Sequence, residues 1–171
     1  MCSSDLLNST NRNFSNENES LHYVVGRPTD LAALASAGQT TANYALQTFT
    51  TPTDAVGGLG TFNDARFEVD IGFQEVSGYV DIAHTGNDYE ISFFGVNTFN
   101  GGQFSDSANV YSSSSCFSAG CTGDVTGLVA GPDADRAGLV YTISDSDELR
   151  KIFGAVTFIR DPEGPPVVFP E

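Results

Sequence analysis

Two cysteines are the residues whose type and spacing point most directly to a chemistry. Cys116 and Cys121 are separated by four residues that include Gly120, and a run of serines precedes them. This spacing predicts a disulfide that closes a tight loop at a hairpin tip, which implies an oxidising compartment outside the cytoplasm. The alternative is a reduced pair or half of a metal site, but zinc needs about four ligands and both histidines, His22 and His84, are distant in the sequence.

The third cysteine, Cys2, belongs to the opening hexapeptide MCSSDL, which is what a common sequencing adapter encodes. We therefore expect residues 1–6 to be foreign to the native chain. Residues 7–20 are expected to be a disordered or truncated lead-in, residues 21–160 the folded domain, and residues 161–171 a Pro-rich tail. On this interpretation Cys2 is not a lipid anchor.

Motifs of nucleophilic, zinc-protease or phosphate-binding chemistry are absent from the sequence, which has no G-x-S-x-G, H-E-x-x-H or G-x-x-x-x-G-K. His22 and His84 fall on predicted strands, where each is better explained as a strand residue than as a base or a haem ligand. Acidic pairs occur at Asp133–Asp135 and Asp145–Glu148, but neither has the pattern of a calcium-binding loop. We predict no catalytic residue, metal site or cofactor, with a secreted hydrolase as the alternative.

The charge of the chain limits its partners. The 171 residues include 22 Asp and Glu against 7 Lys and Arg, which gives a formal net charge of −15. Such a surface repels nucleic acid and anionic lipid. The favoured partner is a protein with a basic or mixed patch, or a small neutral ligand, and no transmembrane segment is predicted.

Alternation of apolar and polar residues with a period of two dominates the chain and predicts an all-β fold. The clearest strand is Arg66–Gln74, followed by Val76–His84 and Tyr89–Val96 in an antiparallel meander. Further strands are expected at Ala42–Phe49, Asn109–Ser112, Asp124–Val129, Gly138–Ile143 and Ile152–Ile159, with a shorter one at His22–Val25. The predicted core includes Phe67, Val69, Ile71, Phe73, Ile91, Phe93 and Val156.

Short helical turns and long loops complete the expected elements. Thr29 is expected to cap a helix over Asp30–Ala37 that ends at Gly38, and Asp145 with Glu148 has the spacing of a second capped turn. The longest interior loops are predicted at Thr98–Ala108 and Ser112–Gly123, where contacts with a partner would lie. The candidate binding residues in or beside these loops are Asn100, Gln103, Phe104, Tyr111 and Phe117.

Short, evenly spaced strands suit either a sandwich or a closed barrel. The absence of Trp disfavours a lipocalin, and the polar outward faces disfavour an outer-membrane barrel. Three segments, Leu21–Thr29, Gly38–Tyr44 and Gly127–Tyr141, resemble the barrel domain of transferrin-binding protein B-like surface proteins, and Ile152–Phe158 resembles its closing strand. The most specific match is the G-P-x-A turn with its returning strand, formed by Gly131, Pro132, Ala134 and Gly138.

The resemblance implies a single eight-stranded antiparallel β-barrel with an apolar interior over residues 21–160. It also implies a non-enzymatic binding module that is extracytoplasmic, on the outer-membrane surface or in the periplasm of a Gram-negative bacterium. The partner would be a host or envelope protein, or a small ligand such as haem. Similar domains occur in larger envelope proteins that carry a FecR-type module, so a structural C-terminal domain without its own ligand is the alternative.

Overall fold

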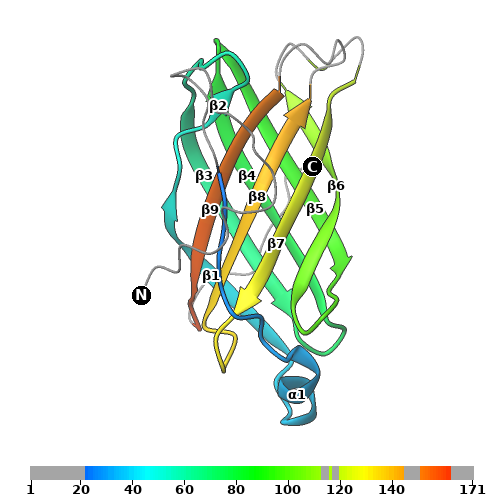
Figure 1. Ribbon diagram of the computed structural model, residues 1–171. Helices are drawn as coiled ribbons and strands as arrows, with labels where there is room; N and C mark the ends of the chain where they lie inside the picture. Colours follow the sequence, from blue (N-terminus) through cyan, green and yellow to red (C-terminus); the bar gives the residue numbers. More distant parts are fainter. Residues whose placement is uncertain (1–21, 113–115, 117–119, 145–150, 163–171) are drawn as a thin grey trace, which may run out of the picture.

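The protein is an antiparallel β-barrel in the computed structural model, which describes residues 22–112, 116, 120–144 and 151–162 (Figure 1). The elements are α1 (Leu31–Ser36), β1 (Thr41–Phe49), β2 (Thr53–Asp54), β3 (Thr61–Asp70), β4 (Glu75–His84), β5 (Asn87–Asn97), β6 (Gln103–Ser112), β7 (Thr122–Ala130), β8 (Arg136–Ser144) and β9 (Lys151–Arg160). Neighbouring strands pair in the order β1-β3-β4-β5-β6-β7-β8-β9, and β1 also pairs with β9. The sheet therefore closes, and the predicted all-β, eight-stranded barrel is confirmed.

The short strand β2 continues the path of β1 along β9. Phe49 at the end of β1 lies opposite Val156, and Thr53 at the start of β2 lies opposite Phe153. Pro52 stands between them, and because proline has no N–H to donate to a ladder it interrupts the pairing. Strands β1 and β2 together therefore take the place of one strand in the eight-stranded barrel.

Aromatic rings pack inside the barrel toward the end where β1 begins, as Tyr44 of β1 packs on Phe67 of β3. This is the lower end in Figure 1, where α1 lies. The ring of Phe67 lies 5.4 Å from Tyr44, 5.7 Å from Phe104, 5.3 Å from Phe158 and 6.3 Å from Phe93, measured between centroids. All five side chains are buried. Fully burying a large apolar side chain contributes roughly 1.5–3 kcal/mol, so this ring cluster is a main source of stability.

Six of the seven predicted core residues are buried, but Phe73 is 76% exposed, so its core assignment is wrong. The predicted strand Arg66–Gln74 is also misplaced, because β3 begins earlier and ends at Asp70. The Asp70 carboxylate accepts a hydrogen bond from the backbone N–H of Phe73 at 3.0 Å, and Gln74 has a φ of +58°. The apolar alternation runs past the end of the strand into a turn, which points Phe73 into solvent.

The predicted loop Thr98–Ala108 is mostly strand, since β6 begins at Gln103. Phe104 is completely buried in the ring cluster and cannot be a binding-loop residue. The Ser- and Asp-containing stretch after it looks like a loop in the sequence because its outward positions are all polar. Pairing with β7 over Gln103–Ala108 makes this stretch a strand.

The helix start is shifted by one residue from its prediction. Asp30 is the N-cap of α1, and its side chain accepts a hydrogen bond from the N–H of Ala33. Thr29 instead is hydrogen-bonded to the end of β7 and to the β7–β8 turn. Its N–H donates to Val129 O at 2.9 Å, and its hydroxyl donates to Gly131 O. The predicted turn at Asp145–Glu148, the predicted segments 1–6 and 7–20, and residues 163–171 of the predicted tail 161–171 lie outside the described residues.

Residues 22–28 form an extended segment, here called the strap, that lies on the outside of the barrel. The predicted strand His22–Val25 is therefore not part of the sheet. Val24 packs over Gly138 of β8, because a Cβ added to Gly138 would lie 2.5 Å from Val24 Cγ1. At the far end of the strap, His22 is hydrogen-bonded to Thr50 and Thr53, both at 2.7 Å. The strap thus joins β7, β8 and the β1–β2 junction from outside.

Candidate functional site

The lower end of the barrel is closed by α1 and by hydrogen-bonded turns. Leu31 of α1 is completely buried against the core. Two side chains hold the β7–β8 turn in place. Tyr44 donates its hydroxyl to Ala134 O at 2.6 Å, and Arg160 donates to Asp133 O at 2.7 Å. Burial raises the pKa of Tyr44 far above its ordinary value, which keeps the hydroxyl protonated as a donor.

The residues of the G-P-x-A turn lie in this closed end. Gly131 has a φ of +92° and Ala134 a φ of +52°, and Ala134 is completely buried. Gly138 lies under the strap on β8 rather than in the turn. The described roles of Gly131, Ala134 and Gly138 are structural, because the first two shape the turn and the third leaves space for a packed segment.

The upper end of the barrel contains a cleft where β6 and β7 separate. Strand β6 pairs with β5 over Asn109–Ser112 but with β7 only over Gln103–Ala108, so the two strands diverge beyond the pair Ala108 and Gly123. The cleft between them has a volume of about 320 Å³. Its lining consists of Ser107–Tyr111 on one side and Cys121–Asp124 on the other.

The disulfide between Cys116 and Cys121 lies beside this cleft, with the two Cα atoms 5.0 Å apart. Tyr111 is 61% exposed on the β6 side, and Asp124 is exposed on the β7 side. An exposed tyrosine ring and a carboxylate on opposite walls can pack against an apolar group and bind a cationic or hydrogen-bond-donating one. Phe117 lies outside the described residues.

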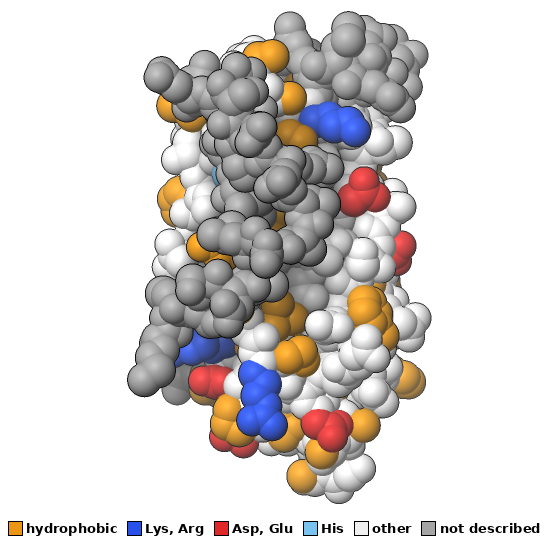
Figure 2. Space-filling model, in the orientation of Figure 1, with side chains coloured by type: hydrophobic (Ala, Val, Ile, Leu, Met, Phe, Trp, Pro, Cys, Tyr) orange, Lys and Arg blue, Asp and Glu red, His pale blue; other side chains and the backbone are white. Residues whose placement is uncertain are grey.

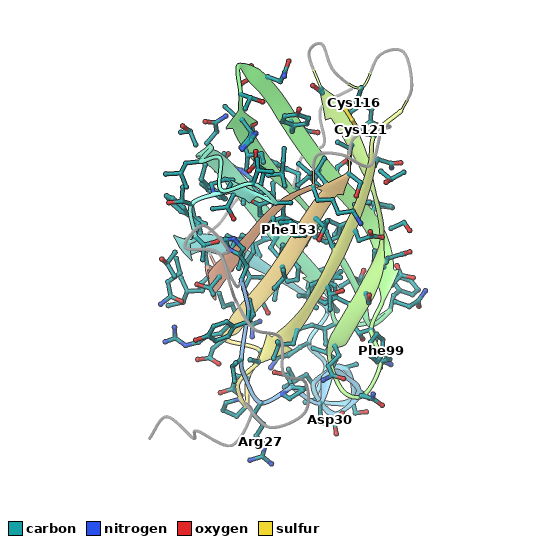
Figure 3. The ribbon with its side chains drawn as sticks, turned by 45° about the horizontal axis from the view of Figure 1, so that its top comes forward. Arg27, Asp30, Phe99, Cys116, Cys121 and Phe153 are labelled. Atoms are coloured by element: carbon teal, nitrogen blue, oxygen red, sulfur yellow. A yellow bond between two sulfur atoms is a disulfide. The ribbon has the colours of Figure 1, made fainter. Side chains whose placement is uncertain are left out.

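The structure separates the residues that the sequence predicted as one binding region. Asn100 and Gln103 lie at the lower end, where the Asn100 amide is 3.4 Å from the Gln103 side chain. Tyr111 and the cysteines lie at the upper end, and Figure 3 shows the disulfide at the opposite end of the barrel from Phe99. The two predicted loops therefore cannot contribute to a single site, and we assign the candidate site to the β6–β7 cleft.

Both histidines are held by neighbours in positions that do not favour catalysis. His84 is 2% exposed at the end of β4, and its Nε2 lies 3.6 Å from Asp54 Oδ2. Both ring nitrogens of His22 contact threonine hydroxyls, and burial lowers the pKa of His22, which favours the neutral ring. Within the described ranges, no three His, Cys, Asp or Glu side chains come together as a metal site.

The loop from Asp54 to Gly60 was not predicted as a functional element, because Gly57, Gly58 and Gly60 are typical of an ordinary turn. This loop presents Val56 and Leu59 to solvent beside β2. The available signal was the presence of Val56 before Gly57 and of Leu59 between Gly58 and Gly60, because a flexible linker has no need of large aliphatic residues. No helix in the described part of the chain is long and apolar enough to span a membrane.

Comparison with known proteins gives structural matches only. No family model matches the sequence, and no curated protein does. The isotype 1 transferrin-binding protein B of serogroup B Neisseria meningitidis is similar with a TM-score of 0.50 and 17% identity, over 80% of this chain and 28% of that chain. A double mutant of transferrin-binding protein B from Haemophilus parasuis Hp5 gives a TM-score of 0.43 and 15% identity, over 70% of this chain and 25% of that chain.

The meningococcal match concerns the fold, and this chain spans little more than a quarter of that protein's length. It agrees with the closed order of eight antiparallel strands described above. The described part of this chain therefore folds as a β-barrel like that of transferrin-binding protein B.

Proposed function

We propose that this chain is a non-catalytic binding domain of a bacterial envelope protein and that its partner contacts the β6–β7 cleft. The observation that carries the proposal is the asymmetry of the barrel. Its lower end is closed by α1 and the anchored turns, whereas its upper end has an open cleft beside a disulfide. A rigid barrel that carries loops and a cleft at one end is a common arrangement for recognition.

The contents of the barrel favour a partner that binds outside it. Five aromatic rings pack on one another in the lower interior and leave no gap between them for a flat apolar ligand such as haem. The net charge of −15 favours a protein with a basic or mixed surface over any polyanion. The disulfide supports an extracytoplasmic location.

The names of the similar structures state that those proteins bind transferrin. For this chain a host iron carrier is one candidate partner among host and envelope proteins. A likeness at 17% identity concerns the fold and does not identify the partner. Transferrin is therefore included in the test as one probe among several.

The test immobilises the full chain and measures binding of four probes: iron-loaded transferrin, haemin, pooled blood plasma and a bacterial envelope extract. Proteins bound from the plasma and the extract are identified by mass spectrometry. The cleft variants are Tyr111→Ser and Asp124→Ser. The matched controls are Phe99→Ser and Asn100→Ser, which alter exposed residues at the opposite end.

We expect capture of a protein partner to fall about tenfold or more in the cleft variants and to be unchanged in the controls. Equal capture by all variants would move the binding site away from the cleft. If neither plasma nor a bacterial envelope extract supplies a partner, the proposed function is wrong, and the domain is then a structural part of a longer envelope protein.

A further inference from the structure

The loop Asp54–Gly60 exposes two large aliphatic side chains on the side of the barrel where β2 lies. Val56 is 78% exposed and Leu59 is 71% exposed. Hydrophobic side chains also emerge along the upper left of the space-filling view, the side on which Figure 1 places β2 (Figure 2). Apolar side chains that gather on one surface commonly mark a contact with another macromolecule.

This loop is held in one conformation by its own hydrogen bonds. One carboxylate oxygen of Asp54 accepts from the N–H groups of Val56 at 3.0 Å and Gly58 at 2.6 Å. The N–H of Asp54 donates to Gly58 O, and that of Gly60 donates to Pro52 O at 2.8 Å. A side chain at Gly58 would clash with the carboxylate, since an added Cβ would lie 2.5 Å from Asp54 Oδ2. The aliphatic side chains are therefore presented by a preorganised loop.

A buried polar pair anchors the loop from inside the barrel rim. The second carboxylate oxygen of Asp54 faces His84 Nε2 at 3.6 Å, and the exposures of the two side chains are 8% and 1%. His84 Nε2 has no hydrogen-bond partner in the described structure. An apolar pair would fill this place at a lower desolvation cost, whereas a polar pair restricts the loop to one position.

Two aromatic rings flank the loop in the chain and pack on each other. Phe49 precedes the loop and Phe62 follows it, and their rings stack with centroids 4.1 Å apart and planes 8° apart. Phe49 is 47% exposed. We call Phe49, Val56, Leu59 and Phe62 the rim patch.

The outer face of β3, β4 and β5, into which the loop leads, carries a row of carboxylates that we call the acidic wall, with Arg66 as its basic neighbour. Asp64 on β3, Asp81 on β4 and Glu90 on β5 lie directly opposite one another in the ladder. Burial raises the pKa values of Asp81 and Glu90, and neighbouring carboxylates raise them further: Asp88 and Asp64 act on Asp81, and Asp81 acts on Glu90. Like charges in register are destabilising, and a cationic group on a partner would relieve this repulsion.

We propose that the rim patch and this acidic wall form a second binding surface, for a protein that presents an apolar segment flanked by Lys or Arg. A second copy of the chain fits less well, because it would bring another net charge of −15 to the same surface. The rim patch lies beside β2 and the cleft lies between β6 and β7 (Figures 1 and 3). The inference is therefore independent of binding at the cleft.

The test selects a phage-displayed library of random twelve-residue peptides on the immobilised full chain and measures the selected peptides by surface plasmon resonance. The variants are Val56→Ser and Leu59→Ser. The matched controls are Val25→Ser and Phe73→Ser, because these side chains are 74% and 76% exposed at other places on the barrel.

We expect the selected peptides to combine apolar residues with Lys or Arg, and to lose about tenfold or more in affinity for the rim-patch variants while binding both controls normally. Asp81→Asn is expected to weaken binding and to reduce its salt dependence. The proposal is overturned if no peptide is enriched, if selected peptides lack basic residues, or if all variants bind alike. Size-exclusion chromatography that shows a dimer broken by Leu59→Ser would overturn it in favour of a second copy.

Discussion

Tyr44 and Tyr141 bury their hydroxyl groups in opposite ways. Tyr44 donates to Ala134 O at 2.6 Å, which fixes the β7–β8 turn against the interior. Tyr141 is completely buried opposite Gly154, and its hydroxyl has no hydrogen-bond partner in the described structure. A buried hydroxyl without a partner is a cost, whereas a paired one is a net contribution.

Phenylalanine substitutions at these two positions should therefore differ. We expect Tyr44→Phe to lower the free energy of unfolding by about 1–2 kcal/mol, because it leaves a buried carbonyl unpaired. Tyr141→Phe should change it by less than about 0.5 kcal/mol or increase it. Urea denaturation followed by circular dichroism measures both, and a larger loss for Tyr141→Phe would mean that its hydroxyl has a partner in solution.

Asp81 illustrates the cost of the acidic wall. Its pKa in the folded protein is raised, by burial first and then by Asp88 and Asp64. A carboxyl with a raised folded pKa destabilises the fold at pH values above that pKa, and the penalty is absent below its unfolded pKa of about 4.

Removing this charge should therefore stabilise the protein at neutral pH only. We expect Asp81→Asn to raise the thermal midpoint by about 1–3 °C at pH 7, with the gain shrinking to nothing as the pH falls toward 4. Differential scanning fluorimetry across this pH range checks the trend. Asp124→Asn on β7 serves as the control, and an equal gain from it would contradict a specific effect of the wall.

At the scale of the elements, strand β3 and its turn explain which phenylalanines stabilise the fold. Phe67 on β3 contacts four other rings, whereas Phe73 follows the end of the strand and faces solvent. We expect Phe67→Ala to cost about 3–5 kcal/mol and Phe73→Ala less than about 0.5 kcal/mol in chemical denaturation. A cost above 2 kcal/mol at Phe73 would place it in the core instead.

The strap and β8 should behave as one packed unit. Gly138→Ala places a methyl group where Val24 packs, so we expect a loss of about 1–3 kcal/mol and faster hydrogen exchange in the strap. Adding Val24→Ala frees space for that methyl group, so the double mutant should be more stable than the sum of the single losses predicts. A double-mutant cycle measures this coupling, and strict additivity would show that the strap is not seated there in solution.

At the scale of the whole molecule, net charge sets a general limit on stability. With a formal charge of −15, the compact state repels itself at neutral pH. We expect the thermal midpoint to rise by about 2–5 °C between roughly 10 mM and 150 mM NaCl, because the screening length falls from about 30 Å to about 8 Å. The increase should disappear near the sequence pI of about 4.1, and a salt effect of the same size there would point to a cause other than self-repulsion.

The sequence alone determined the periodic features of this protein. Period-two alternation is a local property of the chain, so it was enough to predict an all-β fold, most strands and six of seven core residues. It could not locate the end of β3, because Phe73 continues the same pattern into a turn. It also could not identify the start of β6, since Phe104 is the one buried residue among polar neighbours there.

Only the tertiary structure decided which residues share a site. Asn100 and Tyr111 are eleven positions apart in the chain, yet strand β6 carries them to opposite ends of the barrel. Conversely, β2 and the end of β4 bring Asp54 to His84 across thirty positions. Such contacts depend on barrel closure and strand register, which are set by the packing of all the strands together and leave no local trace in the sequence.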